Sequence, residues 1–109
     1  MNLISSVRKF HNSKLFFSKT ELSKILSCYS IGVSKGSWKD YAIAFSRQEA
    51  AFYMFKHYMT SPDCILTKTI NYQRKNIFYN LELQNKKKIK FTKMDDLIVL
   101  LKRHEFYII

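Results

Sequence analysis

The sequence predicts one α+β domain, in which an antiparallel meander of four or five strands is flanked by an N-terminal and a C-terminal helix. Two segments with helical spacing lie towards the ends of the chain, and the segments between them alternate or are rich in β-branched residues. The connections between those segments are short, which favours antiparallel pairing of successive strands. A chain of 109 residues, 47% of them hydrophobic, is long enough for one packed domain and too short for two.

Each expected helix begins at a capping box and continues with an apolar stripe. The first helix spans about 19–34, where Ser18 and Glu21 can satisfy each other's free amides and Gly36 suits the stop. Its stripe is Leu22, Ile25, Leu26, Tyr29 and Val33. The second helix spans about 93–104 and starts at the Thr92–Asp95 box. Its stripe is Met94, Leu97, Ile98 and Leu101, and its last turn carries Lys102, Arg103 and His104, where cations complement the helix dipole.

Five segments between the helices have strand character. Residues 50–58 are ambiguous, because Ala51, Phe52, Phe55 and Met59 also recur at helical spacing. Their aromatic content favours a strand, with a hairpin turn through 47–49. The expected strands are 38–45, 50–58, 64–70, 77–83 and 88–91.

The ends of the chain differ from its middle. Residues 1–16 contain no acid and are predicted to form a basic arm, followed by the domain at 17–105 and an apolar tail at 106–109. An acid-free, Ser-containing basic segment is also typical of an organellar presequence, so a mitochondrial matrix location is the alternative to a cytoplasmic one. No apolar run approaches the length of about 20 residues that spans a bilayer.

Nineteen basic residues against eight acidic ones give a formal charge of +11. Such a surface attracts polyanions, nucleic acid above all. Fifteen of the nineteen are Lys, and the residue types with AT-rich codons (Phe, Tyr, Met, Ile, Asn and Lys) make up 52 of the 109 positions. The lysine excess therefore has two open explanations, a polyanionic partner or a codon bias.

The first half of the chain carries a family resemblance. The residues concerned are Phe17–Leu26, Tyr29 and Gly36–Ile43, with Pro62 and Lys68 further on. Over about 17–68 the chain resembles the alphaproteobacterial domain of unknown function, family 2794, whose most specific positions here are Trp38, Asp40 and Tyr41. It departs from that family's pattern at Lys19 and Lys39, where the family has Arg, at Ser30, where it has Gly, and at Ser37, where it has Glu. The resemblance implies a small cytoplasmic bacterial protein and carries no established activity.

No constellation indicates catalysis. Cys28, Cys64, His57 and His104 lack the spacing of zinc ligands, and two glycines cannot form a phosphate loop. The acids Asp95 and Asp96 fit the first turn of a helix better than a catalytic pair. Trp38 and Asp40 fit a helix–strand corner better than a stacking platform with a base. We therefore expect no enzyme, no cofactor and no metal site.

The remaining indication of function comes from the basic and aromatic residues of the predicted sheet. A sheet that exposes aromatic rings beside lysines can stack bases and neutralise phosphates, which predicts a module for single-stranded nucleic acid. The residues proposed for phosphates are Arg74, Lys75, Lys86, Lys87, Lys88 and Lys90, and those for stacking are Tyr53 and Phe55. The alternative function is a structural or adaptor subunit, or a homo-oligomer, with the uncovered sheet face or the apolar tail as its interface. The same residues also fit a simple core with a lysine-protected edge.

Overall fold

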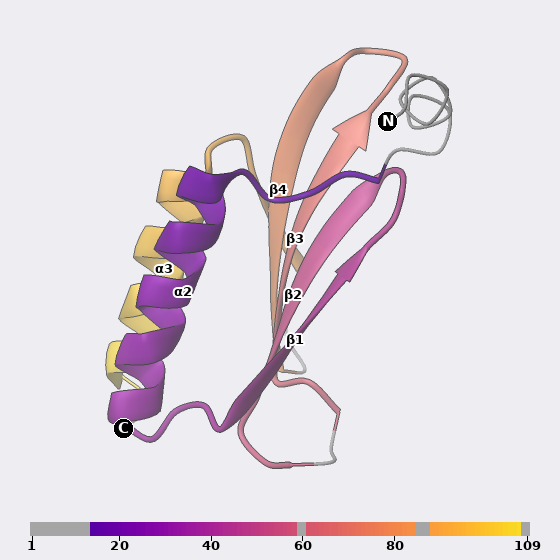
Figure 1. Ribbon diagram of the computed structural model, residues 1–109. Coiled ribbons are helices and arrows are strands. Elements are labelled where there is room, and N and C mark those ends of the chain that lie inside the picture. Colours follow the sequence, from indigo (N-terminus) through magenta and orange to yellow (C-terminus); the bar gives the residue numbers. More distant parts are fainter. Residues whose placement is uncertain (1–13, 59–60, 85–87, 108–109) are drawn as a thin grey trace.

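The computed structural model describes residues 14–58, 61–84 and 88–107, and over these the predicted α+β meander is confirmed (Figure 1). Every neighbouring pair of strands is antiparallel, and the order in the sheet is the order in the chain, β1-β2-β3-β4-β5. The elements are α2 (Lys19–Ser34), β1 (Asp40–Phe45), β2 (Glu49–Phe55), β3 (Cys64–Asn71), β4 (Asn76–Leu83), β5 (Lys88–Phe91) and α3 (Met94–Tyr107).

Helix α2 has the ends that the sequence predicts. At its start, the Ser18 hydroxyl accepts from the Glu21 amide at 3.1 Å, and the Glu21 carboxylate accepts from the Ser18 amide at 2.8 Å. At its end, Gly36 has a φ of +83°. The amides of Gly36 and Ser37 donate to the carbonyls of Val33 and Gly32, the two bonds of a Schellman motif.

The buried arc of α2 differs from the predicted stripe. Its centre is formed by Ile25, Cys28 and Gly32, whereas the side chain of Val33 is 44% exposed. Successive residues of a helix point about 100° apart, so Val33 lies well round the helix from the buried Gly32. The assignment of Val33 to the stripe was therefore wrong, because two packing partners, the sheet and α3, set which arc is covered.

The ambiguous segment is a strand. Strand β2 pairs with β1 on one side and β3 on the other, and those ladders satisfy its backbone, so the helical alternative at 50–58 is wrong. Helix α3 begins at Met94 and continues to Tyr107, beyond the predicted end at 104. Part of the predicted apolar tail is thus helical, and residues 108–109 lie outside the described chain.

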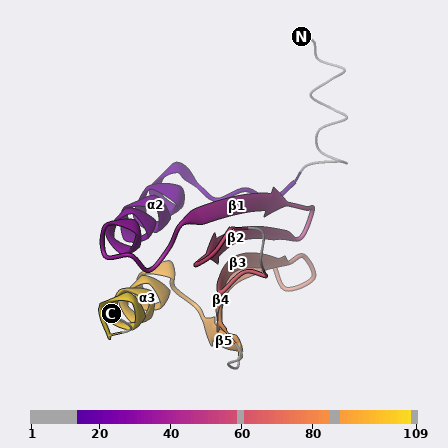
Figure 2. The same cartoon turned by 90° about the horizontal axis from the view of Figure 1, so that it is seen from below.

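Both helices lie against the same face of the sheet (Figure 2). The core lies between these two layers and includes Phe52, Leu66 and Leu81 from the three central strands and Leu97 from α3. Trp38 is 1% exposed at the corner between α2 and β1, as the corner interpretation predicts. Residues 14–18, which precede α2 and which we call the N-terminal strap, are attached to the sheet. The Leu15 amide donates to the Ser46 carbonyl at 2.7 Å. Residues 1–13, most of the predicted arm, lie outside the described chain.

Candidate functional site

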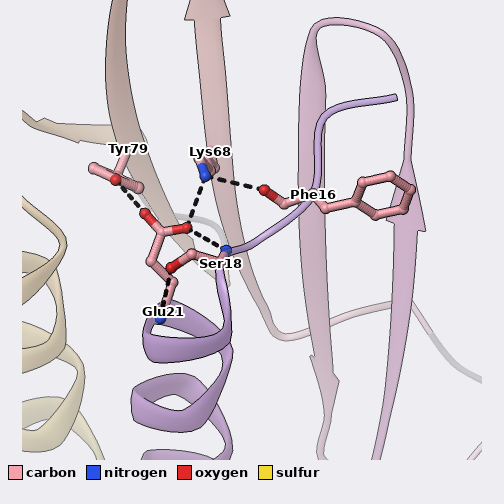
Figure 3. Close-up of polar contacts among 5 residues, drawn as sticks. All are labelled: Phe16, Ser18, Glu21, Lys68 and Tyr79. Atoms are coloured by element: carbon pink, nitrogen blue, oxygen red, sulfur yellow. Dashed lines mark hydrogen bonds and ion pairs between the residues drawn. The ribbon is translucent and has the colours of Figure 1, made fainter. Parts of the chain in front are cut away.

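A cluster of polar side chains lies at the N-terminus of α2, between the helix and the sheet (Figure 3). The ammonium group of Lys68, on β3, donates to the Glu21 carboxylate at 2.8 Å and to the Phe16 carbonyl at 3.0 Å. The hydroxyl of Tyr79, on β4, donates to the other oxygen of the same carboxylate. One carboxylate therefore caps its own helix and joins that helix to the two neighbouring strands.

The electrostatics of this cluster follow from burial and from its hydrogen bonds. Burial by itself would raise the pKa of Glu21, but donation from Lys68, Tyr79 and the Ser18 amide outweighs it, and the pKa is lowered. For Tyr79, burial and the adjacent Glu21 carboxylate act in the same direction and raise the pKa well above its ordinary value. At neutral pH the cluster is thus a carboxylate paired with an ammonium group and a neutral phenol.

This cluster is a structural tie rather than a reactive site. Each of its polar side chains forms a hydrogen bond with another residue of the cluster, and Lys68 is 7% exposed. The sequence pattern assigns Glu21 no role beyond the helix cap, and it assigns no partner to Tyr79. The available signal was Lys68 itself, since a lysine inside the β-branched run 64–70 needs a buried counter-charge.

The other face of the sheet is covered by neither helix, and we call it the open face. Because strand residues alternate, the register puts Tyr53 and Phe55 on this face, with Phe78 of β4 on the same side. All three rings are half-buried, and between them lie the small or polar side chains of Ala51, Thr67 and Asn80. The two residues predicted to stack bases therefore do share one uncovered surface.

Two of the predicted phosphate ligands border the same surface. Lys88 and Lys90, both exposed, stand opposite Glu82 and Asn80 in the β4–β5 register, on the open face. The Lys90 ammonium lies over the Phe78 ring, 4.3 Å from its centroid, which is a cation–π contact. The ion pairs among the described residues are Lys24–Asp95 and Lys68–Glu21, so neither Lys88 nor Lys90 forms an ion pair with a described acid, although Glu82 stands directly opposite Lys88.

The other predicted phosphate ligands do not join that group. Arg74 and Lys75 lie in the β3–β4 turn, at the end of β4 opposite to the turn that leads into β5. The predicted phosphate ligands are therefore divided between two places on the sheet, because successive turns of a meander lie at opposite ends of the strand that they share. Lys86 and Lys87 lie outside the described residues.

The three family-motif positions have local structural roles. Trp38 is buried at the corner, and the Asp40 carboxylate accepts from the Tyr41 amide at 2.8 Å. The Tyr41 ring stacks parallel to Phe52, with centroids 5.0 Å apart, at the rim of the helix-covered face. This favours the corner interpretation of the motif over a base at Asp40.

The candidate metal and thiol residues form no metal-binding group in the part of the chain that the structure describes. In the described ranges, no three His, Cys, Asp or Glu side chains are grouped so that they could hold a metal ion. The Cys28 and Cys64 side chains are buried in the core, and His57 is exposed after β2. Within the same ranges, no helix combines the length and the apolar character needed to cross a membrane.

The match to a protein family covers most of this architecture. The family model described as "Protein of unknown function (DUF2794)" matches residues 15–97, from the strap before α2 to the first turns of α3. The chain belongs to this family. The matched range extends well past residue 68, where the resemblance in the sequence became vague, and it includes all five described strands of the sheet. No curated protein and no solved structure matches the chain.

Proposed function

We propose that this protein binds single-stranded nucleic acid on the open face of its sheet. The observation that carries the proposal is the strand register, which gathers Tyr53, Phe55 and Phe78 on the face that neither helix covers. Lysines 88 and 90 stand on the neighbouring edge strand, and the formal charge of the chain is +11. Rings supply sequence-tolerant stacking, and lysines supply phosphate contacts.

The contact between Lys90 and Phe78 suggests how base stacking and phosphate binding cooperate. With nothing bound, the ammonium group occupies one face of the ring. A base that stacks on Phe78 replaces that ammonium, which is then free to meet the phosphate of the same nucleotide. Each stacked base contributes about 1–3 kcal/mol, so two or three rings suffice for a measurable complex.

The test is fluorescence anisotropy of a labelled oligothymidylate or oligouridylate of about ten nucleotides at about 50 mM salt. Tyr53→Leu and Phe78→Leu should each weaken binding about 5- to 100-fold, because each removes one stacking ring. The matched control is Tyr58→Leu, which alters an exposed tyrosine beyond the end of β2.

The charge contribution has its own readout. Lys90→Gln should reduce the slope of log affinity against log salt concentration by about one. Lys102→Gln, on the exposed side of α3, should leave that slope unchanged. Absence of binding to both oligonucleotides, or equal effects of the open-face and control variants, would reject the proposal.

A structural or adaptor role is the second candidate. The observation in its favour is the outer edge of the sheet at β1, whose residues Asp40–Phe45 include no lysine, in contrast to Lys88 and Lys90 at the β5 edge. The charge on this edge is that of Asp40, at the first residue, and an edge with so little charge can accept another strand. Association that survives nuclease treatment and is abolished by Ala44→Lys, which adds to the β1 edge a charge that opposes strand pairing, would favour this candidate over nucleic acid.

A further inference from the structure

The open face continues into a groove at one end of the sheet. There the β1–β2 turn (46–48) meets the β3–β4 turn (72–75), and Figure 1 shows both turns at the end of the sheet nearest the start of α2. Two hollows of about 440 and 320 Å³ lie between the turns and share Gln48 and Tyr72 in their walls. The larger also includes Arg47, and the smaller reaches Phe78 on the open face. We call the two together the tip groove.

The walls of the tip groove suit a phosphate and a base. The Tyr72 hydroxyl donates to the Arg47 carbonyl at 2.6 Å, which ties the two turns together and leaves the side chain of Tyr72 53% exposed. Arg47 is one of the residues that line the larger hollow, and it forms no ion pair with any described acid. A planar guanidinium without a protein counter-ion can take a phosphate oxygen pair, and a neighbouring aromatic ring can take the base.

The turn beside the groove is rigid and basic. The Asn71 side-chain oxygen accepts from the amides of Gln73 at 3.0 Å and Arg74 at 3.2 Å, which fixes the first half of the turn. Lys75 closes the turn with a φ of 55°. The described residues that line the groove include no carboxylate, and the nearest acid along the chain is Glu49, next to Gln48.

Building on the function proposed above, we infer that the tip groove holds one nucleotide of the bound strand, its phosphate on Arg47 and its base beside Tyr72. The strand enters the groove from Phe78, the open-face ring that lines it. In the register, Phe78 stands opposite Thr69, and Thr69 stands opposite Glu49, six residues before Phe55 on β2. The distance along the strands from Phe55 to the groove is therefore about 20 Å.

That separation gives a length-dependent test with Arg47→Gln as the variant. By anisotropy, its affinity for an oligothymidylate of about ten nucleotides should fall about 3- to 10-fold and its salt dependence by about one ion. Its affinity for an oligomer of about three nucleotides should stay within twofold of the wild type, because so short an oligomer can bind Tyr53 and Phe55 without reaching the groove. The matched control is Arg103→Gln on the exposed side of α3.

Two further variants sharpen the result. Glu49→Gln should raise affinity for the longer strand, because it removes the nearest negative charge, and Tyr72→Leu should lower it by removal of the ring. If Arg47→Gln and Arg103→Gln behave alike while Tyr53→Leu still weakens binding, the tip groove is not a nucleotide site and the open-face function stands. If the wild type binds neither oligomer, the proposed function and this inference both fail.

Discussion

Thr67 and Lys68 are consecutive residues of β3, each 7% exposed, and their side chains lie on opposite faces of the sheet. The two buried polar groups differ in their hydrogen-bond partners. On the helix-covered face, the Lys68 ammonium has the Glu21 carboxylate and the Phe16 carbonyl as partners. On the open face, the buried Thr67 hydroxyl has no hydrogen-bond partner among the described residues. A charge cannot be buried without partners, whereas an unpaired hydroxyl costs only a few kcal/mol at most.

The covered face is therefore organised for stability, and the open face is the surface that we propose for binding. Three elements converge on Glu21, so the tie beneath α2 fixes the helix layer on the sheet. The open face has half-buried rings, exposed lysines and one unsatisfied hydroxyl, and the contact of Lys90 with Phe78 joins two neighbouring strands rather than a helix to the sheet. Substitutions on the two faces should accordingly separate stability from binding.

The largest expected effect is at Lys68. Lys68→Met should lower the free energy of unfolding by about 3–5 kcal/mol, because it leaves the Glu21 carboxylate without its charged partner. Urea denaturation measures this change. Lys24→Met, which breaks the exposed pair with Asp95, is the control and should cost at most about 1 kcal/mol.

A companion variant separates charge from packing. The double variant Glu21→Gln with Lys68→Met should be more stable than Lys68→Met alone, since it no longer holds an unpaired carboxylate. If Lys24→Met and Lys68→Met lowered the free energy of unfolding equally, the stabilising role assigned to the covered face would be contradicted.

The next expected effect is on pH dependence, and it also belongs to the covered face. The pKa of Glu21 in the folded protein lies below its ordinary value of 4.5, so its stabilising contribution is complete above about pH 4.5 and is lost as the pH falls through the folded-state pKa. The pKa of Tyr79 is raised above 10.0, so its contribution is complete below about pH 10 and is lost as the pH rises through the folded-state value.

Denaturation midpoints at several pH values test these directions. Glu21→Gln should flatten the acidic side of the stability profile, and Tyr79→Phe should flatten the alkaline side. Variants on the open face, such as Phe78→Leu, should leave both sides unchanged. A wild-type stability that rises as the solution is acidified below pH 4.5 would run against the assigned role of Glu21.

The smallest expected effect is at Thr67. Thr67→Val keeps the shape of the side chain and removes a hydroxyl that has no described partner, so the free energy of unfolding should stay the same or rise by up to about 1 kcal/mol. Thr69→Val, two residues along β3 on the same face and half-buried, is the control. A loss of more than about 1 kcal/mol in Thr67→Val alone would mean that the hydroxyl has a partner in solution.

Much of the fold could be predicted because its signals are local. The Ser18–Glu21 capping box, the stop at Gly36 and the alternation over 77–83 each depend on residues close in the chain, and the structure confirms all three. The candidate site was predictable in part for the same reason. Alternation alone places Tyr53 and Phe55 on one face, and the meander then exposes that face.

Other features depend on contacts between distant residues. No local pattern assigns Lys68 to Glu21, 47 positions earlier, or Tyr79 to the same carboxylate. Nor does it show that Arg47 and Tyr72 meet at the tip groove, or that Arg74 and Lys75 lie apart from Lys88 and Lys90.

By itself, the sequence determined where the helices and the strands other than β2 lie, because caps, turns and hydrophobic periods act over a few residues. The tertiary structure decided which face of the sheet the helices cover, which arc of α2 is buried and which charges meet. Those outcomes depend on the packing of whole layers, whose energy is set by residues far apart in the chain.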